Sequence, residues 1–212
     1  MNKIVIGISG KTCSGKTYLL NHLLETGKFS KLVTSTSRNP RVGEVEGEDY
    51  YFITPLQAEK WVHGNGFFEH ITFGAEENQK VYGLTYHELD RKIADTSKIP
   101  CVILTPAGQQ QYEFLLRKLG IQLVKVLIDA PESVLMERLV SRTTNEVVEN
   151  YLSNQSLNPD FVREKITNAI DRARTITTVE AGWAHVLKWD AVFQSGRPAE
   201  DFVKIVESFS NL

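Results

Sequence analysis

The chain is short of cysteine, of long apolar runs and of net charge, and each shortage excludes a class of protein. Its two cysteines, Cys13 and Cys101, are too few for a disulfide framework or a cysteine-based zinc site. No window approaches the roughly 18 consecutive apolar residues of a membrane span, and the apolar run near Met1 is too short for a signal peptide. A formal charge of −2 argues against a dedicated nucleic-acid binder. We therefore expect a reduced, cytoplasmic protein with no membrane or nucleic-acid partner; its oligomeric state is left open.

Short apolar runs alternate with helical patterns along most of the chain. The runs at residues 4–8, 101–104 and 123–128 are rich in β-branched residues, as strands buried on both faces are. Each is followed by residues with helical spacing, which predicts an α/β fold with a parallel sheet flanked by helices. A later run at 185–189 predicts a further strand before a last helix that starts at Pro198.

Two stretches interrupt this alternation within a single domain over residues 1–212. Residues 34–84 are rich in glycine, aromatic and charged residues and predict a small strand-rich insertion. Residues 142–174 begin with a polar, weakly patterned segment between two arginine-bearing helices, which suggests a helical lid. Residues 1–33, 85–141 and 175–212 are then the core.

A glycine-rich loop follows the first predicted strand and matches G-x-x-x-x-G-K-[ST] in full. Its residues are Gly10, Lys11, Thr12, Cys13, Ser14, Gly15, Lys16 and Thr17. Such a loop directs backbone N–H groups at phosphate oxygens, and the helix that follows adds its positive N-terminus. Lys16 is expected to reach the β- and γ-phosphates of a nucleoside triphosphate, and the Thr17 hydroxyl to ligate Mg²⁺.

A phosphate loop alone leaves motor, switch and kinase functions open, so the next segment decides between them. Arg38 and Arg41 flank Pro40 in a loop that also contains glycine. Two guanidinium groups placed in this way suit a second phosphate group, although a solvated charged loop is an equal alternative on these residues alone.

The chain resembles the guanylate kinase family. The resemblance rests on T-[ST]-R-x-P-R-x-G-E-x-x-G-x-D-Y-x-F at residues 36–52, on Gly-Phe-Phe-Glu at 66–69, on Tyr-Gly at 82–83 and on the position of the phosphate loop. It is strong over residues 1–85 and weak beyond 100. It implies a P-loop nucleoside monophosphate kinase that transfers the γ-phosphate of ATP to GMP or dGMP, with Mg²⁺ as cofactor.

The resemblance also implies roles for individual residues. Glu69 would read the base, because one carboxylate can accept hydrogen bonds from both N1–H and N2–H₂ of guanine, and Thr34 and Thr85 would offer hydroxyls to the same substrate. The acceptor phosphate would be bound by Arg38, Arg41, Tyr50 and Tyr82. Arg138 and Arg142, four residues apart on a predicted helix, would close over the triphosphate and act with Lys16 and Arg38 in catalysis.

Several positions depart from the family pattern and keep alternatives open. Leu84 stands where the family has Ser or Thr, and Thr105-Pro106-Ala107 stands where it has acidic residues. Lys165 stands where a lid arginine is expected, so that Arg163, Arg172 and Arg174 can be lid groups or solvated charges. The alternatives are another or modified deoxynucleoside monophosphate as acceptor, and a non-catalytic binding module. An apparent insertion within residues 75–80 adds to these departures.

Overall fold

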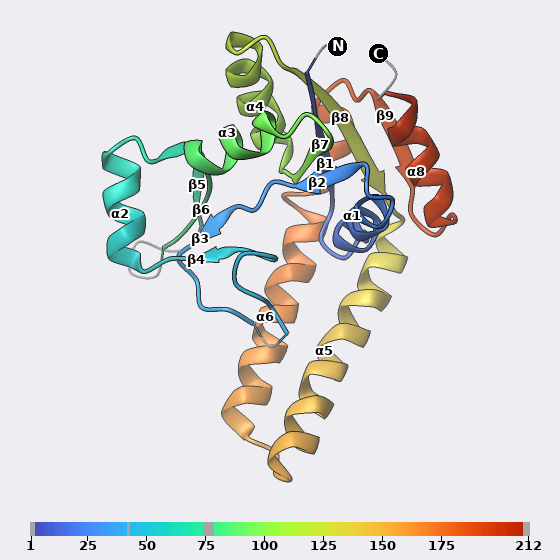
Figure 1. Ribbon diagram of the computed structural model, residues 1–212. Coiled ribbons are helices and arrows are strands. Elements are labelled where there is room, and N and C mark those ends of the chain that lie inside the picture. The colour runs from blue at the N-terminus through green and yellow to red at the C-terminus, as the bar shows by residue number, and fades with distance from the viewer. Residues whose placement is uncertain (1–2, 42, 74–78, 210–212) are drawn as a thin grey trace.

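The computed structural model describes residues 3–41, 43–73 and 79–209, and the strands in these ranges form two sheets (Figure 1). The larger sheet is parallel throughout, in the order β2 (Phe29–Lys31), β7 (Ile99–Ile103), β1 (Ile4–Gly10), β8 (Gln122–Asp129) and β9 (Ala191–Gln194). The helices are α1 (Lys16–Glu25), α2 (Pro55–His63), α3 (Tyr86–Ala94), α4 (Pro106–Lys118), α5 (Glu132–Asn154), α6 (Pro159–Thr177), α7 (Trp183–Val186) and α8 (Ala199–Ser208). The predicted α/β fold is confirmed.

The larger sheet is buried on both faces, which explains why its strands have nearly continuous apolar sequences. Successive side chains of β1 point to opposite faces. Ile6 packs with α1 and α8 on one face, and Val5 packs with Tyr112 and Leu116 of α4 on the other. The carboxyl end of β1 is therefore fixed between two apolar layers, directly before the phosphate loop.

The predicted strand-rich insertion forms the smaller sheet. Its order is β4 (Tyr51–Phe52), β3 (Ser35–Thr36), β6 (Lys80–Thr85) and β5 (Phe67–Phe73), with β6 antiparallel to both of its neighbours. Phe68 of β5 and Leu84 of β6 share an apolar cluster with Leu89 of α3 and Tyr112 of α4. This shared cluster fixes the smaller sheet against the larger one.

Helices α5 and α6 project from the core as a pair, seen in yellow and orange in Figure 1. Leu135, Leu139 and Ile176 anchor the base of the pair in a small apolar cluster. Asn158 caps α6 by accepting hydrogen bonds from the N–H groups of Asp160 and Phe161. We call these two helices the α5–α6 hairpin.

One expectation about local structure is wrong. Residues 185–189 do not form a strand: α7 occupies Trp183–Val186, and the strand follows at Ala191–Gln194. The polar segment after Arg142 is mostly helical, because α5 continues to Asn154. The apparent insertion at 75–80 lies largely outside the described residues. In the part of the chain that the structure describes, no helix is long and apolar enough to cross a membrane.

Candidate active site

The phosphate loop curls between β1 and the first turn of α1. Gly15 has a φ of +96° and directly precedes the helix, a conformation that favours glycine. Cys13 also has a positive φ, +65°, which is uncommon for a residue with a side chain. A hydrogen bond from Ser14 N–H to the Lys11 carbonyl closes the turn. The loop therefore has the shape expected of an anion-binding nest at a helix N-terminus.

Lys16 folds back over this loop. Its Nζ donates to the carbonyl oxygens of Gly10 and Lys11, at 2.7 and 2.8 Å. Burial lowers the pKa of Lys16 to about 8, although the carboxylate of Glu180 opposes this shift. A buried ammonium group held only by neutral carbonyls is ready to exchange them for phosphate oxygens.

Arginine side chains from separate elements surround one cavity beside the loop, which we call the arginine cavity, of about 530 Å³. Arg138 and Arg142 come from α5, Arg172 from α6 and Arg41 from the loop after β3. Nε and Nη2 of Arg142 are buried and have no hydrogen-bond partner among the described residues. Burial, together with Arg142 and Arg41, lowers the pKa of Arg172. This crowding of cations suits a highly charged anion.

Arg138 also shapes the loop directly. Its Nη1 donates to the Cys13 carbonyl at 3.2 Å and to Ser195 Oγ at 2.8 Å. Ser195 Oγ in turn donates to the Ser14 carbonyl at 3.0 Å. Arg138 therefore both faces the cavity and holds the outer side of the loop.

A second cavity, of about 280 Å³, lies between the two sheets, and we call it the inter-sheet cavity. Lys16 and Gly10 of the larger sheet's loop line it, as do Glu69 and Tyr82 of the smaller sheet. Further lining residues are Thr34, Tyr50, Ile71, Gly83, Ile103, Leu104, Thr105, Gly108, Glu180 and Trp183. The cavity thus brings a phosphate-binding lysine and a buried carboxylate into one space.

Glu69 is the buried acid of this cavity, with 7% of its surface exposed. Burial raises its pKa to about 7, and the Tyr112 hydroxyl opposes this shift. Tyr112 is fully buried, and its hydroxyl makes no hydrogen bond of regular geometry to a described residue, so its contact with Glu69 is loose. The carboxylate is therefore poised to accept donors from a ligand.

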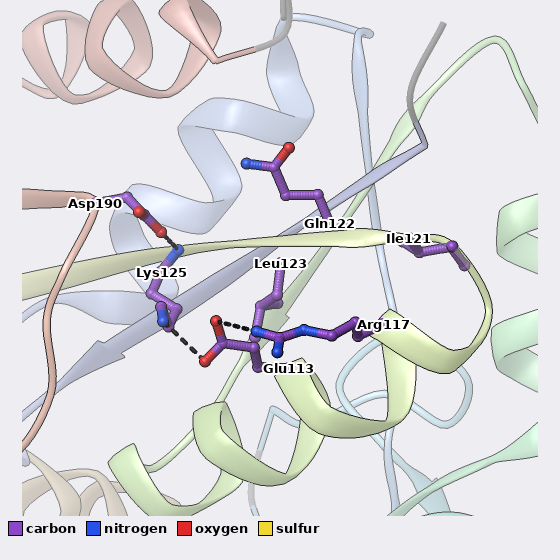
Figure 2. Close-up of a pocket in the computed structure, with 8 residues that line it drawn as sticks. Glu113, Arg117, Ile121, Gln122, Leu123, Lys125 and Asp190 are labelled. Carbon is purple, nitrogen blue, oxygen red and sulfur yellow. Dashed lines mark hydrogen bonds and ion pairs between the residues drawn. The ribbon is translucent and has the colours of Figure 1, made fainter.

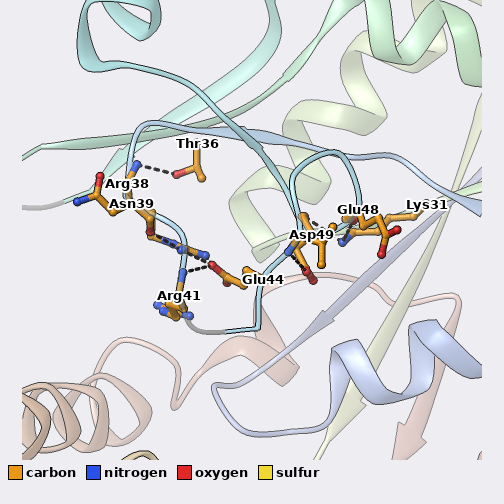
Figure 3. A network of polar contacts seen from close by, with 9 residues as sticks. Lys31, Thr36, Arg38, Asn39, Arg41, Glu44, Glu48 and Asp49 are labelled. Atoms are coloured by element: carbon orange, nitrogen blue, oxygen red, sulfur yellow. Dashed lines mark hydrogen bonds and ion pairs between the residues drawn. The ribbon is translucent and has the colours of Figure 1, made fainter. Parts of the chain in front are cut away.

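Arg38 is engaged by a neighbouring carboxylate in the polar network of Figure 3. Its Nη1 and Nη2 donate to the two oxygens of Glu44, each at 2.6 Å, and its guanidinium lies 4.9 Å from the Tyr50 ring centroid. Burial by itself lowers the pKa of Arg38, but the hydrogen bonds to Glu44 outweigh it and raise that pKa. Unlike Arg41, Arg38 does not line either cavity as described.

The profile described as guanylate kinase matches residues 1–160 of this chain. The chain belongs to the guanylate kinase family. A protein named guanylate kinase from Francisella tularensis subsp. holarctica (strain OSU18) is 34% identical over 114 residues, which make up 52% of this chain and 58% of that protein. One from Homo sapiens is 41% identical over 68 residues, 31% of this chain and 34% of that protein.

The chain spans about half the length of the curated guanylate kinases that it matches. A solved structure, guanylate kinase from Anaplasma phagocytophilum, aligns with a TM-score of 0.58 at 19% identity and covers 99% of this chain and 85% of that chain. At this identity the structural likeness concerns the fold alone.

Leu84, Thr85 and Thr105 lie at or beside positions that depart from the guanylate kinase pattern, and each has a structural role. Leu84 is fully buried in the cluster beneath the smaller sheet. Thr85, expected to offer a hydroxyl to the substrate, instead caps α3 by accepting from Glu88 N–H, and it is not among the residues that line the inter-sheet cavity. Thr105 does line that cavity, although its hydroxyl also caps α4 by accepting from Gly108 N–H.

The structure identifies site residues that the sequence analysis did not assign. Arg172, left open between two roles, lines the arginine cavity, whereas Lys165 pairs with Glu146 at 2.7 Å. Glu180 and Trp183 line the inter-sheet cavity from the segment that follows α6. Helical spacing could have favoured Arg172, because it lies seven residues from Lys165 on the same helix. Nothing in the sequence around Glu180 marks it.

A further hollow of about 400 Å³ lies beside α4 and the start of β8 (Figure 2). Its charged side chains already have hydrogen-bond partners. Lys125 Nζ donates to Glu113 at 2.9 Å, and the Asp190 carboxylate accepts from the backbone N–H of Lys125 at 2.7 Å. It lies toward the amino ends of the parallel strands, whereas ligands of open α/β sheets bind outside the carboxyl ends. This hollow is therefore separate from the candidate active site.

Proposed function

We propose that this chain is an ATP-dependent kinase that phosphorylates GMP or dGMP, giving ADP and GDP or dGDP. The observation that carries the proposal is the inter-sheet cavity, which has Lys16 of the phosphate loop and the buried Glu69 on its walls. A guanine monophosphate bound there with its base at Glu69 would direct its phosphate toward the loop. Membership of the guanylate kinase family supports the same reaction.

The donor would bind at the phosphate loop. Lys16 and the N–H groups of Cys13 and of residues 15–17 would bind the β- and γ-phosphates. Arg138, Arg142 and Arg172 would neutralise the charge that develops on the transferring group. Because water at this position would hydrolyse ATP, we propose that the α5–α6 hairpin is a lid that closes over the site and excludes it.

The acceptor would bind between the sheets. Tyr50, Tyr82 and Arg41 would hold its phosphate near the loop, with Thr34 beside them. Arg38 would contribute through the stacked Tyr50 and through Glu44, since Glu44 also accepts from the N–H of Arg41 at 2.7 Å. The oxygen of a phosphate monoester is already a nucleophile, so the transfer needs no strong base.

Mg²⁺ fits the residues present. The Thr17 hydroxyl lines the arginine cavity. No group of three or more histidine, cysteine, aspartate or glutamate side chains among the described residues could form a metal cage. Mg²⁺ usually takes one or two protein ligands together with substrate phosphates and water, so Thr17 with the phosphates of ATP would be sufficient. The ion would supply charge neutralisation between the β- and γ-phosphates.

A cytoplasmic location stays a prediction.

An alternative acceptor is favoured by one specific observation. Leu84 stands where the family has a hydroxyl beside the base, and it is buried in the cluster beneath the smaller sheet and is not among the residues that line the inter-sheet cavity, so this hydroxyl is missing from the base end. Another or modified deoxynucleoside monophosphate would then be the substrate of the same phosphoryl transfer.

The test is release of ADP from ATP and Mg²⁺ in the presence of each common ribonucleoside and deoxynucleoside monophosphate in turn. We expect turnover to concentrate on GMP or dGMP. Turnover on a different monophosphate would replace the assigned acceptor but keep the reaction. ATP binding without turnover on any of them would contradict the proposed kinase activity on these acceptors.

A first variant tests the phosphate chemistry separately from the base. Lys16→Met removes the ammonium group that would contact the transferring phosphate, and we expect turnover to be abolished while the folded structure is retained, as checked by circular dichroism and thermal unfolding. Retained turnover would contradict the assignment of Lys16.

A further inference from the structure

Glu180 is a buried carboxylate that the proposed reaction does not use. It lies in the short segment between α6 and α7, and only 5% of its surface is exposed. Its backbone is fixed on both sides: its N–H donates to the Thr175 carbonyl at 2.9 Å, and its carbonyl accepts from Trp183 N–H at 3.2 Å. The position of the carboxylate is therefore set by the end of the α5–α6 hairpin.

Both carboxylate oxygens of Glu180 bind one residue of the phosphate loop. Oε2 accepts from Thr12 N–H at 2.7 Å, and Oε1 accepts from Thr12 Oγ1 at 2.9 Å. The two residues are 168 positions apart in the chain. Burial of a carboxylate is costly unless it is hydrogen-bonded and faces a positive charge, and Lys16 lines the same cavity.

This contact completes a set of restraints on both sides of Cys13. On one side Glu180 holds Thr12, and on the other Ser195 and Arg138 hold the carbonyls of Ser14 and Cys13. Cys13 lies between them at a φ of +65°. A residue in such a conformation persists only where the surrounding contacts fix it. Among the described residues, Glu180 is the side chain that holds Thr12, whereas the preceding Gly10 and Lys11 are held through their carbonyls by Lys16.

A negative charge beside an anion-binding loop also has an unfavourable effect, because it repels phosphate. The hydrogen bond to Glu180 removes Thr12 N–H from the set of free donors. The Ser14 N–H already donates to the Lys11 carbonyl, and the amides of Cys13 and of residues 15–17 remain for phosphate. The carboxylate therefore contributes by shaping the loop rather than by contacting the nucleotide.

We propose that Glu180 is a positioning residue for ATP, which holds the phosphate loop in its binding conformation through Thr12 and links that conformation to the end of helix α6. The inference rests on the proposed binding of ATP by the loop. When only a fraction of molecules has a competent loop, the apparent dissociation constant rises by the inverse of that fraction. Loss of the contact should therefore weaken ATP binding much more than acceptor binding.

The experiment compares Glu180→Ala, Glu180→Gln and Thr12→Val with the unmodified protein. It measures the Kd for ATP directly by calorimetry, then the KM values for ATP and acceptor, and the thermal unfolding of each variant. We expect Glu180→Ala to raise the Kd and KM for ATP about tenfold or more, the range for loss of a hydrogen bond to a charged group. The KM for the acceptor should change less than about threefold, well below the same range.

Glu180→Gln provides the conservative rescue. Its amide can accept from Thr12 N–H and donate to Thr12 Oγ1, so both contacts survive without the charge, and ATP affinity should be restored to within about threefold because neutral hydrogen bonds are about half as strong. Thr12→Val should weaken ATP binding by itself and add little to Glu180→Ala.

Glu132→Gln is the matched control: that carboxylate contacts Lys11 of the loop at 3.6 Å, but its side chain is 51% exposed.

The outcomes separate the two proposals. Unchanged ATP affinity in Glu180→Ala, an equal loss for ATP and acceptor, or no rescue by Glu180→Gln would overturn the positioning role. If the unmodified protein binds ATP and the variants behave as expected, but no monophosphate is phosphorylated, the positioning role stands and the kinase function fails. Failure of the unmodified protein to bind ATP would overturn both.

Discussion

Arg41, Arg142 and Arg172 crowd around one cavity, and this crowding gives the site its electrostatic character. Burial and the two neighbouring cations lower the pKa of Arg172, which means that the folded chain disfavours its charged form. Such an arrangement contributes nothing to the stability of the free protein. It is stabilised once a polyphosphate supplies the missing negative charge.

Arg172→Ala should therefore separate activity from stability. We expect kcat to fall by about 10²-fold or more, the effect of losing one group that stabilises charge in the transition state. The melting temperature should stay level or rise, because a repulsive cation has been removed. Arg174→Ala is the control, since Arg174 is 75% exposed at its side chain and pairs with Asp171 on the same helix. Equal losses in both variants would contradict the role of Arg172.

Glu69 should give the reaction a pH dependence. Only the ionised carboxylate can accept both guanine donors, and burial raises its pKa to about 7. The value of kcat/KM for GMP should therefore rise between pH 6 and pH 8 and then level off. Glu69→Gln should be much less active and lose this rise. The substrate's own phosphate, with a pKa of about 6, titrates equally in both proteins and so serves as the internal reference.

The same pKa shift has a consequence for stability, with the opposite direction. Because the pKa of Glu69 is raised in the folded state, the protonated side chain contributes to the unfolding free energy. This contribution is complete below the unfolded-state pKa and is lost as pH rises through about 7. The unfolding free energy should therefore fall more steeply between pH 5 and pH 8 in the unmodified protein than in Glu69→Gln. Parallel stability curves for the two proteins would contradict a raised pKa.

At the scale of elements, the α5–α6 hairpin is the part that the sequence described least well. The segment after Arg142 lacks a continuous apolar stripe because, beyond Leu139, α5 has no core to face. Its helical structure comes instead from pairing with α6, including the Glu146–Lys165 ion pair. Strand β9 was misplaced because it is a four-residue edge strand in which only Phe193 is buried, and its apolar run is no longer than that of the neighbouring residues 185–189.

Gln155, which ends α5, offers a test of hairpin stability. Its φ of +51° is the left-handed conformation that glycine adopts readily. Gln155→Gly should raise the unfolding free energy by about 0.5–1 kcal/mol, which corresponds to roughly 1–4 °C in melting temperature for a chain of this size. Gln155→Ala should give no gain, because alanine keeps the strain. A melting temperature lowered by glycine would show that the residue is not held in this conformation.

At the scale of the whole molecule, Glu88 joins the two sheets. This buried residue of α3 accepts from Val33 N–H, in the segment between β2 and β3, at 3.1 Å, and from Nη2 of Arg91 at 2.6 Å. The Tyr51 hydroxyl of β4 donates at 3.4 Å to Oε2 of Glu88, the oxygen that also accepts from Arg91. The Glu88 carboxylate thus contacts Arg91 of its own helix α3, the segment between β2 and β3, and β4 of the smaller sheet.

Glu88→Ala should destabilise the protein by about 2–3 kcal/mol, because it leaves the Val33 N–H buried without an acceptor. The measurement is equilibrium unfolding in urea. Glu113→Ala is the comparison, since Glu113 also pairs with two cations, Lys125 and Arg117, but is a third exposed at its side chain and accepts from no backbone group of the described residues. A loss no larger than that of Glu113→Ala would contradict the joining role.

The sequence was informative where chemistry imposes a spacing. The phosphate loop, the alternation of strands and helices, the strand-rich insertion and the family were predicted, because each has a local pattern. Arg172 and Glu180 were not assigned, since their roles depend on contacts such as Thr12–Glu180 across 168 residues. The role expected for Thr85 stays a prediction, and its hydroxyl also caps a helix. The division into core, insertion and lid stays a prediction.

The placement of the inter-sheet cavity has a consequence for how substrate range can change. Lys16 belongs to the larger sheet's loop, whereas Glu69 and Leu84 belong to the smaller sheet. Substitutions at the base end can therefore alter which nucleobase is accepted and leave the phosphate end untouched. In evolutionary terms the acceptor range can drift without loss of chemistry. For protein engineering, the positions around Glu69 in the smaller sheet, with Tyr82 kept, are the ones to randomise when kinases for nucleotide analogues are sought.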